Sequence, residues 1–174
     1  MGKQALDIPR GSPTFLADPD ALTIIGLDTE DGLDHVLWDK RCKQTPSKAL
    51  ALDIIERGIL EPVIVRKNGT TIEIIVGRRR VKAARLANEL IHENPEKYGE
   101  QPIRVPCIVK SGDDKVLLGA VIAENAQRED LDALEQAAQI QRALDRGFSE
   151  AEAAIAFGVH EQTIKNRLQL IDAA

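Results

Sequence analysis

The chain has 174 residues, of which 43% are apolar and 29% charged, a composition that suits one ordinary domain or a small domain joined to a helical module. No apolar run reaches the length of a membrane span, and the first residues lack the apolar core of a secretory signal, so we expect a cytoplasmic protein with no membrane partner. The formal net charge of −5 argues against nucleic-acid binding over the whole surface, so any site for a polyanion has to be local.

In the first half of the chain, residues 1–32 contain three prolines and little periodicity. We expect a mostly irregular arm there, to which residues 22–27 can add an edge strand. The apolar pattern that follows predicts a helix, a hairpin with an Asn-Gly turn, and a second helix. These elements are a helix over 46–57, strands over 59–65 and 71–76, and a helix over 78–90.

The second half of the chain begins with a polar loop and becomes helical after residue 130. Capping-box patterns at Asp132 with Glu135 and at Ser149 with Glu152 mark the starts of two helices. The predicted elements are a loop over 92–101, a strand over 103–109, and helices over 115–124, 132–144, 150–157 and 161–171. We therefore expect an α+β protein with an arm over 1–32, a mixed domain over 33–110 and a helical domain over 111–174.

The first candidate site is the start of the helix over 78–90, a stretch with five basic residues and one acid. It opens with Gly77, Arg78, Arg79 and Arg80. Glycine lets a ligand approach the backbone, the first amides of a helix point at anions, and arginine donates paired hydrogen bonds. Three arginines at a helix N-terminus oppose the helix dipole, which makes sense if a polyanion binds there. The alternative is a solvated basic helix face.

The second candidate is Glu124 with Asn125, followed by Arg128. Carboxylate and carboxamide oxygens are hard ligands, and they suit a magnesium ion that keeps most of its waters. Arg128 then reaches a phosphate or a neighbouring domain. The alternative is that Asn125 ends a helix and the charges are solvated.

The third candidate is a helix-turn-helix over residues 149–171, with Gly158 in the turn. Its second helix presents polar side chains that can contact bases in a major groove. They are Glu161, Gln162, Thr163, Lys165, Asn166 and Arg167. Since only two of them are basic, we expect weak attraction to phosphates from this module alone. The alternative is a plain helical hairpin.

Four segments in this order resemble the ParB chromosome and plasmid partition family, and look closest to short ParB-like proteins of phages and mobile elements. They are residues 58–66, residues 77–84, residues 124–131 and the helix-turn-helix. The resemblance covers about residues 35–171. It implies a ParB/sulfiredoxin-like mixed α/β domain followed by an all-helical DNA-binding domain.

The resemblance also implies roles for individual residues. In the family the first segment lines the cytosine of CTP, which carries over to Gly58, Ile59, Leu60 and Pro62. The second segment holds the phosphates, which carries over to Gly77, Arg79, Arg80 and Lys82, with Arg78 as a further cation. The Glu-Asn pair meets the magnesium ion. Nucleotide binding then joins two subunits as a clamp around DNA, and hydrolysis reopens the clamp.

Three departures from the family pattern affect these expectations. Arg78 stands where the family has a glutamate associated with hydrolysis, so we expect phosphate binding with slow or absent hydrolysis. The Gln-Pro-Arg segment before the first helix is missing, and Arg41 or Lys43 stands in for it. The chain ends at Ala174, before the family's C-terminal dimerisation domain.

We therefore expect a magnesium-dependent CTP- and DNA-binding protein that acts in partition or regulation as a nucleotide-dependent homodimer. It would be associated with the nucleoid, in the host cytoplasm if phage-encoded. One alternative is a ParB-like nuclease or ATP-using enzyme without a cytosine preference. Another is a helix-turn-helix repressor whose DNA binding ignores nucleotides. A sulfiredoxin activity needs a cysteine in the glycine motif, where this chain has arginines.

Overall fold

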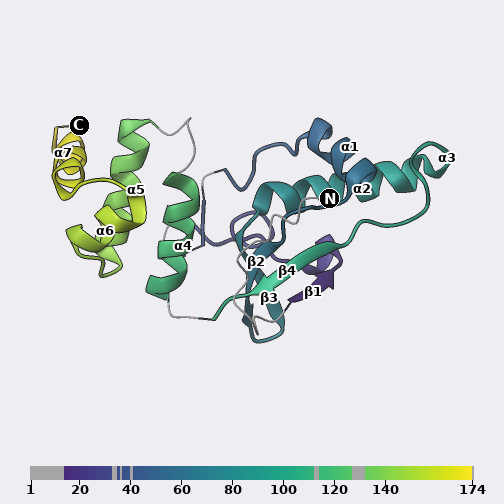
Figure 1. Ribbon diagram of the computed structural model, residues 1–174, viewed down its shortest axis with the longest axis horizontal. Helices are drawn as coiled ribbons and strands as arrows, with labels where there is room; N and C mark the ends of the chain where they lie inside the picture. The colour runs from purple at the N-terminus through teal and green to yellow at the C-terminus, as the bar shows by residue number, and fades with distance from the viewer. Residues whose placement is uncertain are drawn as a thin grey trace. The chain divides into compact units, whose positions relative to one another are not determined.

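The computed structural model describes residues 14–32, 35, 37–39, 41–111, 114–126 and 132–173 (Figure 1). It divides into two compact units, Met1–Ser111 and Gly112–Ala174. The first unit is a mixed α/β unit and the second is helical, so the predicted α+β class is confirmed. No helix in the described ranges has both the length and the apolar character needed to cross a membrane.

The first unit is built on a four-stranded sheet with the order β1-β4-β2-β3. Strands β2 (Val63–Asn68) and β3 (Thr71–Val76) form the predicted hairpin, and Gly69 in its turn has a φ of 61°. Strand β4 (Val105–Val109) runs parallel to β2, and β1 (Thr14–Ala17) pairs antiparallel with β4. β1 lies in the segment expected to be irregular, so that expectation is wrong at 14–17. Local pattern could not show it because β1 is defined by its pairing with β4, far along the chain.

Helices α1 (Lys48–Arg57) and α2 (Arg78–Glu93) pack against each other in the first unit. Ser47 caps α1 by accepting a hydrogen bond from the Leu50 amide, as the sequence pattern suggests. Ala51 and Ile54 of α1 meet Ala83 and Ala87 of α2, and the small alanine side chains let the two helices approach closely. A short helix, α3 (Pro95–Tyr98), lies where we expected only a loop, because Asn94 caps it and Pro95 starts it.

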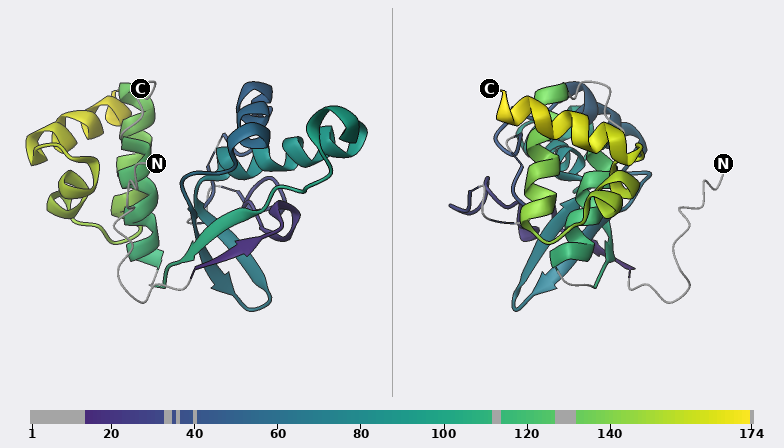
Figure 2. Two further views of the ribbon diagram at one scale, coloured as in Figure 1. Left: turned by 45° about the vertical axis from the view of Figure 1, so that its right-hand side comes forward. Right: turned by 90° about the vertical axis from the view of Figure 1, so that its left-hand side faces the viewer.

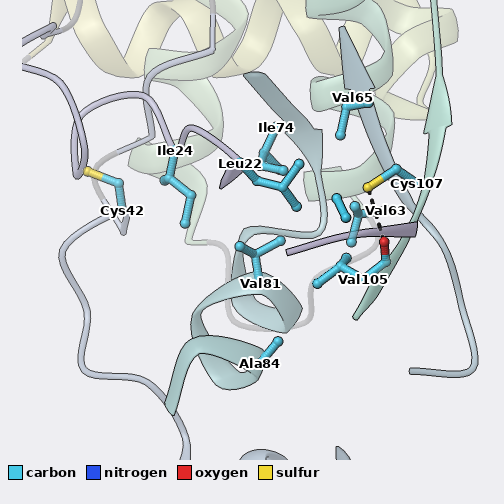
Figure 3. Packing of buried hydrophobic residues seen from close by; sticks show 11 residues of the cluster. Leu22, Ile24, Cys42, Val63, Val65, Ile74, Val81, Ala84, Val105 and Cys107 are labelled. Carbon is cyan, nitrogen blue, oxygen red and sulfur yellow. Dashed lines mark hydrogen bonds between the residues drawn. The ribbon is translucent and has the colours of Figure 1, made fainter. Parts of the chain in front are cut away.

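The core of the first unit lies between α2 and the sheet. Figure 3 shows side chains of this core that come from the strands of the sheet, from α2 and from the N-terminal segment. Val81 and Ala84 supply the helix side of this core. Cys107 is buried in it, donates its thiol to the Val105 carbonyl at 3.4 Å, and has its pKa raised by burial to about 11. That thiol is therefore a packing group and not a nucleophile.

The N-terminal segment runs from one edge of the sheet to the other. After β1 it forms the short helix η1 (Pro19–Ala21). The Thr23 amide then donates to the Ile72 carbonyl at 2.8 Å, and the Ile74 amide donates to the Thr23 carbonyl at 2.9 Å. Thr23 thus makes an isolated parallel bridge to β3, at the opposite edge from β1.

The second unit contains α4 (Asp114–Ala126), α5 (Ala133–Asp145), α6 (Glu150–Phe157) and α7 (Glu161–Asp172) (Figure 2). Asp132 caps α5, and the Ser149–Glu152 capping box opens α6, both as predicted. Gly158, with a φ of 66°, lies in the turn between α6 and α7. The buried side chains of α5, α6 and α7 are apolar and include Ala137, Ile140, Ala143, Ala153, Phe157 and Ile164.

Candidate functional site

Gly77 joins β3 to α2 with a φ of 108°, a conformation that glycine adopts without strain. A Cβ atom at this position would lie 2.5 Å from Val63 Cγ1. The close backbone approach that the sequence suggested for Gly77 is thus an approach to the first residue of β2. As the N-cap residue of α2, Gly77 has no side chain to accept from the first amides of the helix, and no other side chain in the described ranges accepts from them.

The basic residues of α2 fall into two sets that lie on different faces of the helix. Arg78, Lys82 and Arg85 are spaced by four and three residues and therefore share one helix face. Each of these three residues donates hydrogen bonds to backbone carbonyls of the segment 19–44, and we call them the carbonyl-binding row. Arg79 and Arg80 lie outside that face.

The members of the carbonyl-binding row each hold a different part of the N-terminal segment. Arg78 Nη2 donates to the Leu37 carbonyl at 2.6 Å. Lys82 Nζ donates to the Cys42 carbonyl at 3.0 Å and also to the Gln44 carbonyl. Arg85 Nη2 donates to the Leu22 carbonyl at 2.7 Å. The sequence predicted that Arg78 and Lys82 bind phosphates. In the structure, both side chains instead donate hydrogen bonds to backbone carbonyls.

Lys82 is the most buried of these cations, with only 9% of its surface exposed. Burial lowers the pKa of its ammonium group below the usual value, and the nearby positive charge of Arg85 lowers it further. The two carbonyl acceptors compensate part of the cost of burying this charge. Lys82 therefore links the chain around Cys42, itself a buried residue, to α2.

Replacing Lys82 by Met should release this part of the chain. We expect the rate of Cys42 modification by a thiol reagent to rise about tenfold or more, because each lost charged hydrogen bond is worth about 1.5–3 kcal/mol. Thiol-labelling kinetics with mass spectrometry would measure this rate, with buried Cys107 as an internal reference. Lys97→Met, at an exposed position of α3, is the control. Unchanged Cys42 labelling would contradict the role given to Lys82.

Arg79 and Arg80 are the cations that remain near the N-terminus of α2. Arg79 is exposed and forms no hydrogen bond or ion pair with any residue in the described part of the chain. Arg80 is partly buried, and its Nη1 donates to the Glu61 carbonyl at 2.7 Å and to the Pro62 carbonyl at 2.9 Å. A helix N-terminus with uncapped amides and these two guanidinium groups suits an anion such as a phosphate chain.

The segment 58–62 links α1 to β2 beside Arg80. Gly58 ends α1 with a φ of 74°, and its amide donates to the Ile54 carbonyl at 2.8 Å. Ile59 packs against the core, whereas the Leu60 side chain is 77% exposed. The loop therefore presents an exposed apolar side chain to solvent.

Glu124 and Asn125 occupy the last turn of α4, in the second compact unit. Glu124 is partly buried; the side chain of Asn125 and all of Arg128 lie outside the described residues. A carboxylate and a carboxamide fit a magnesium ion by their chemistry, because both offer hard oxygen ligands. The arginine and Glu-Asn halves of the predicted site thus belong to different units.

Helix α7 presents only part of the predicted DNA-contacting set on its exposed face. Gln162, Lys165 and Asn166 are exposed, and Gln162 donates to Asn166 at 3.0 Å. Glu161 is also exposed, whereas Thr163 is partly buried.

Arg167, the last residue of the predicted DNA-contacting set, is partly buried and points towards α5. Arg167 Nε donates to Gln136 Oε1 of α5 at 2.9 Å, so this guanidinium holds two helices together. Gln169, which sequence reasoning missed, is exposed and lies three residues after Asn166 on the same face. The helical spacing from Gln162 through Asn166 was the signal that could have found it.

The helical unit is acidic. Residues 112–174 contain twelve acidic and six basic residues, so the formal charge of this stretch is −6. Two of the basic residues are also engaged with carboxylates: Lys115 lies 2.9 Å from Glu152 Oε2, and Lys165 lies 3.8 Å from Glu150 Oε2. Such a charge gives little non-specific attraction to DNA phosphates.

Comparison with known proteins identifies the family that this chain resembles. The model of the ParB N-terminal domain matches residues 40–126. The chromosome-partitioning protein Spo0J of Thermus thermophilus is 36% identical over 132 residues, which are 76% of this chain and 44% of that protein. A probable chromosome 1-partitioning protein ParB of Deinococcus radiodurans is 35% identical over 122 residues, covering 70% of this chain and 38% of that one.

A solved structure shares the fold. The C-terminally truncated ParB of Caulobacter crescentus complexed to the centromeric parS site matches with a TM-score of 0.57 and 21% identity, over 90% of this chain and 71% of that one. The chain spans less than half the length of the two curated relatives described above.

Proposed function

This chain belongs to the ParB family, and from that premise we propose that it binds CTP with magnesium at the N-terminus of α2 and double-stranded DNA through α7, as a partition or regulatory protein. The family is that of the matching domain model and the curated relatives. The Thermus relative is a chromosome-partitioning protein, and the Caulobacter structure is a complex with a centromeric DNA site.

The observation that carries the nucleotide proposal is the pair of arginines beside the uncapped start of α2. Arg79 is exposed, and Arg80 lies next to the loop 58–62. Arginines at a helix N-terminus raise the energy of the empty protein by opposing the helix dipole, and a bound polyanion reverses that effect. Arg79 and Arg80 are therefore the proposed phosphate ligands. Gly58, Ile59, Leu60 and Pro62 are the proposed lining of the base.

Glu124 and Asn125 are by their chemistry the proposed magnesium ligands, and Arg128 is a further proposed ligand of the nucleotide. The bound ion would neutralise part of the triphosphate charge. Arg78, which donates to the Leu37 carbonyl, offers no carboxylate to activate a water molecule. We therefore expect the protein to hydrolyse bound CTP slowly.

The negative charge of the helical unit limits how tightly α7 alone can bind DNA. Gln162, Lys165 and Asn166 face outward on α7 and suit base contacts, but a stretch with a formal charge of −6 attracts phosphates weakly. Retention on DNA would then depend on a second copy of the chain closing around the duplex. A nucleotide-dependent homodimer supplies that closure.

Titration calorimetry of the four nucleoside triphosphates with magnesium tests the proposal. We expect the protein to bind CTP most tightly. Arg79→Ala and Arg80→Ala should each weaken triphosphate binding about tenfold or more, because a charge-assisted hydrogen bond is worth about 1.5–3 kcal/mol. Lys97→Ala, which removes an exposed cation from α3, should leave the affinities unchanged. Equal affinities for all four nucleotides, unaffected by either arginine substitution, would contradict the proposal.

A further inference from the structure

Arg80 connects two parts of the first unit that are distant in sequence. Its Nη1 atom donates to the Glu61 carbonyl at 2.7 Å and to the Pro62 carbonyl at 2.9 Å. Arg80 lies in the first turn of α2, whereas these carbonyls lie immediately before β2. One guanidinium nitrogen therefore fixes the backbone of the loop relative to the start of the helix.

The same guanidinium has donors left over. Nε and Nη2 carry three further N–H groups, and no hydrogen bond joins them to a residue in the described ranges. The side chain of Arg80 is 25% exposed, so solvent and solutes reach it. Glu61 Oε2, 3.9 Å from Nη1, belongs to a side chain that is 65% exposed. Arg80 can thus bind an anion with these donors while Nη1 still holds the loop.

Among the described residues, no other side chain donates a hydrogen bond to the Glu61 or Pro62 carbonyl. Gly58 ends α1, Ile59 packs against the core, and Leu60 is exposed. The positions of the Glu61 and Pro62 carbonyls consequently depend on Arg80. Because Nη1 of Arg80 donates to both carbonyls, a phosphate bound at Arg80 would be next to this loop, which is therefore placed to contact the attached base.

We propose that Arg80 is a specificity-determining residue that acts by positioning the Glu61–Pro62 backbone, so that the choice of base depends on it. This inference rests on the proposed nucleotide site and assigns different roles to the adjacent Arg79 and Arg80. Arg79 binds the phosphates of every nucleotide alike. Arg80 binds phosphate and also holds the backbone that distinguishes one base from another.

Two charge-conserving variants separate these roles. Arg80→Lys keeps the positive charge but replaces the planar fork with an ammonium group that cannot reproduce its geometry. We expect the ratio between the affinities for the preferred and the next-best nucleoside triphosphate to fall about tenfold in Arg80→Lys. In Arg79→Lys, affinities for all nucleotides change together and the ratio stays the same. Calorimetric titration of the full chain with the four magnesium-bound triphosphates measures both.

The outcomes distinguish this inference from the proposed function. A wild-type protein that binds no triphosphate would overturn both, as would one that binds all four equally. A selective wild type whose Arg80→Lys variant keeps its ratio within about twofold, or whose Arg79→Lys variant loses it, overturns only the role of Arg80.

A measurement on the wild-type protein covers the case in which Arg80→Lys fails to fold. Magnesium tripolyphosphate has no base, yet it should order the loop through Arg80. We expect it to slow amide hydrogen exchange at Leu60 and Glu61 about threefold. Unchanged exchange at saturating tripolyphosphate would overturn the coupling.

Discussion

Gly77→Ala is expected to lower the free energy of unfolding of the first unit by about 3 kcal/mol. An alanine at a φ of 108° is strained, which costs about 1–3 kcal/mol. Its Cβ would also lie 2.5 Å from Val63 Cγ1, so β2 or α2 has to shift, and such overpacking typically costs about 1–3 kcal/mol. Urea unfolding followed by the fluorescence of Trp38, the single tryptophan and a residue of the first unit, measures the effect.

Gly69→Ala separates the two causes. Gly69 has a φ of 61°, but a Cβ atom there meets nothing within 4 Å. We expect this control to cost about 1 kcal/mol, which is the backbone strain alone. Losses of equal size in the two variants would show that the contact with Val63 does not matter. A Gly77→Ala variant as stable as wild type would show that the junction between β3 and α2 can relax.

Arg85→Met should destabilise the first unit by about 2–3 kcal/mol, because charged hydrogen bonds are worth about 1.5–3 kcal/mol and several are lost together. Arg85 forms a paired contact with Asp28, with Nη1–Oδ1 at 2.9 Å and Nη2–Oδ2 at 2.6 Å. It also donates to the Pro19 and Leu22 carbonyls. Methionine keeps much of the apolar stem while removing every donor.

The control for Arg85 is another arginine that pairs with an aspartate on the surface. Arg57 pairs with Asp53 at 3.1 Å in α1, and both side chains are largely exposed. Arg57→Met should change the free energy of unfolding by about 0.5 kcal/mol or less. A similar loss from both substitutions would contradict the claim that Arg85 holds the N-terminal segment in place.

The ion pair between Asp28 and Arg85 also predicts that the free energy of unfolding depends on pH. Burial tends to raise the pKa of Asp28, but the hydrogen bonds from Arg85 and the Ile24 amide, with the charge of Arg85, outweigh it and lower the pKa below 3.8. The stabilisation is therefore complete above the ordinary value and is lost as the pH falls through the lowered value. The stability difference between wild type and Arg85→Met should narrow in that acidic range. A constant difference would contradict the assignment.

Much of this molecule could be predicted from local sequence because the determinants are themselves local. Ser47, Asp132 and the Ser149–Glu152 pair cap the helices where predicted, and Asn68-Gly69 forms the hairpin turn. Capping and turn formation involve residues only a few positions apart, so a short window of sequence contains the whole interaction. The four motifs of the family likewise depend only on residue type and order.

The directions of the basic side chains were decided by the tertiary structure. The sequence places Arg78, Arg79, Arg80 and Lys82 together and suggests one phosphate cluster. The fold brings the Leu37, Cys42 and Gln44 carbonyls against one face of α2 and the Glu61 and Pro62 carbonyls against another. A cation's partner depends on which backbone lies opposite it, and that is set by chain segments about 20 to 40 positions away.

In the N-terminal segment and in α7, hydrogen-bond partners are likewise set by distant parts of the chain. The sequence predicted an irregular arm that includes residues 14–17, but pairing with β4 makes them a strand, and Thr23 forms a bridge to β3. The sequence determined that Arg167 carries a guanidinium on a helix, but packing against α5 directed it to Gln136. Residue types and local spacing thus predicted most of the helices, the hairpin and the family resemblance, while long-range packing determined which charges hold the chain together, because hydrogen-bond partners are chosen in three dimensions.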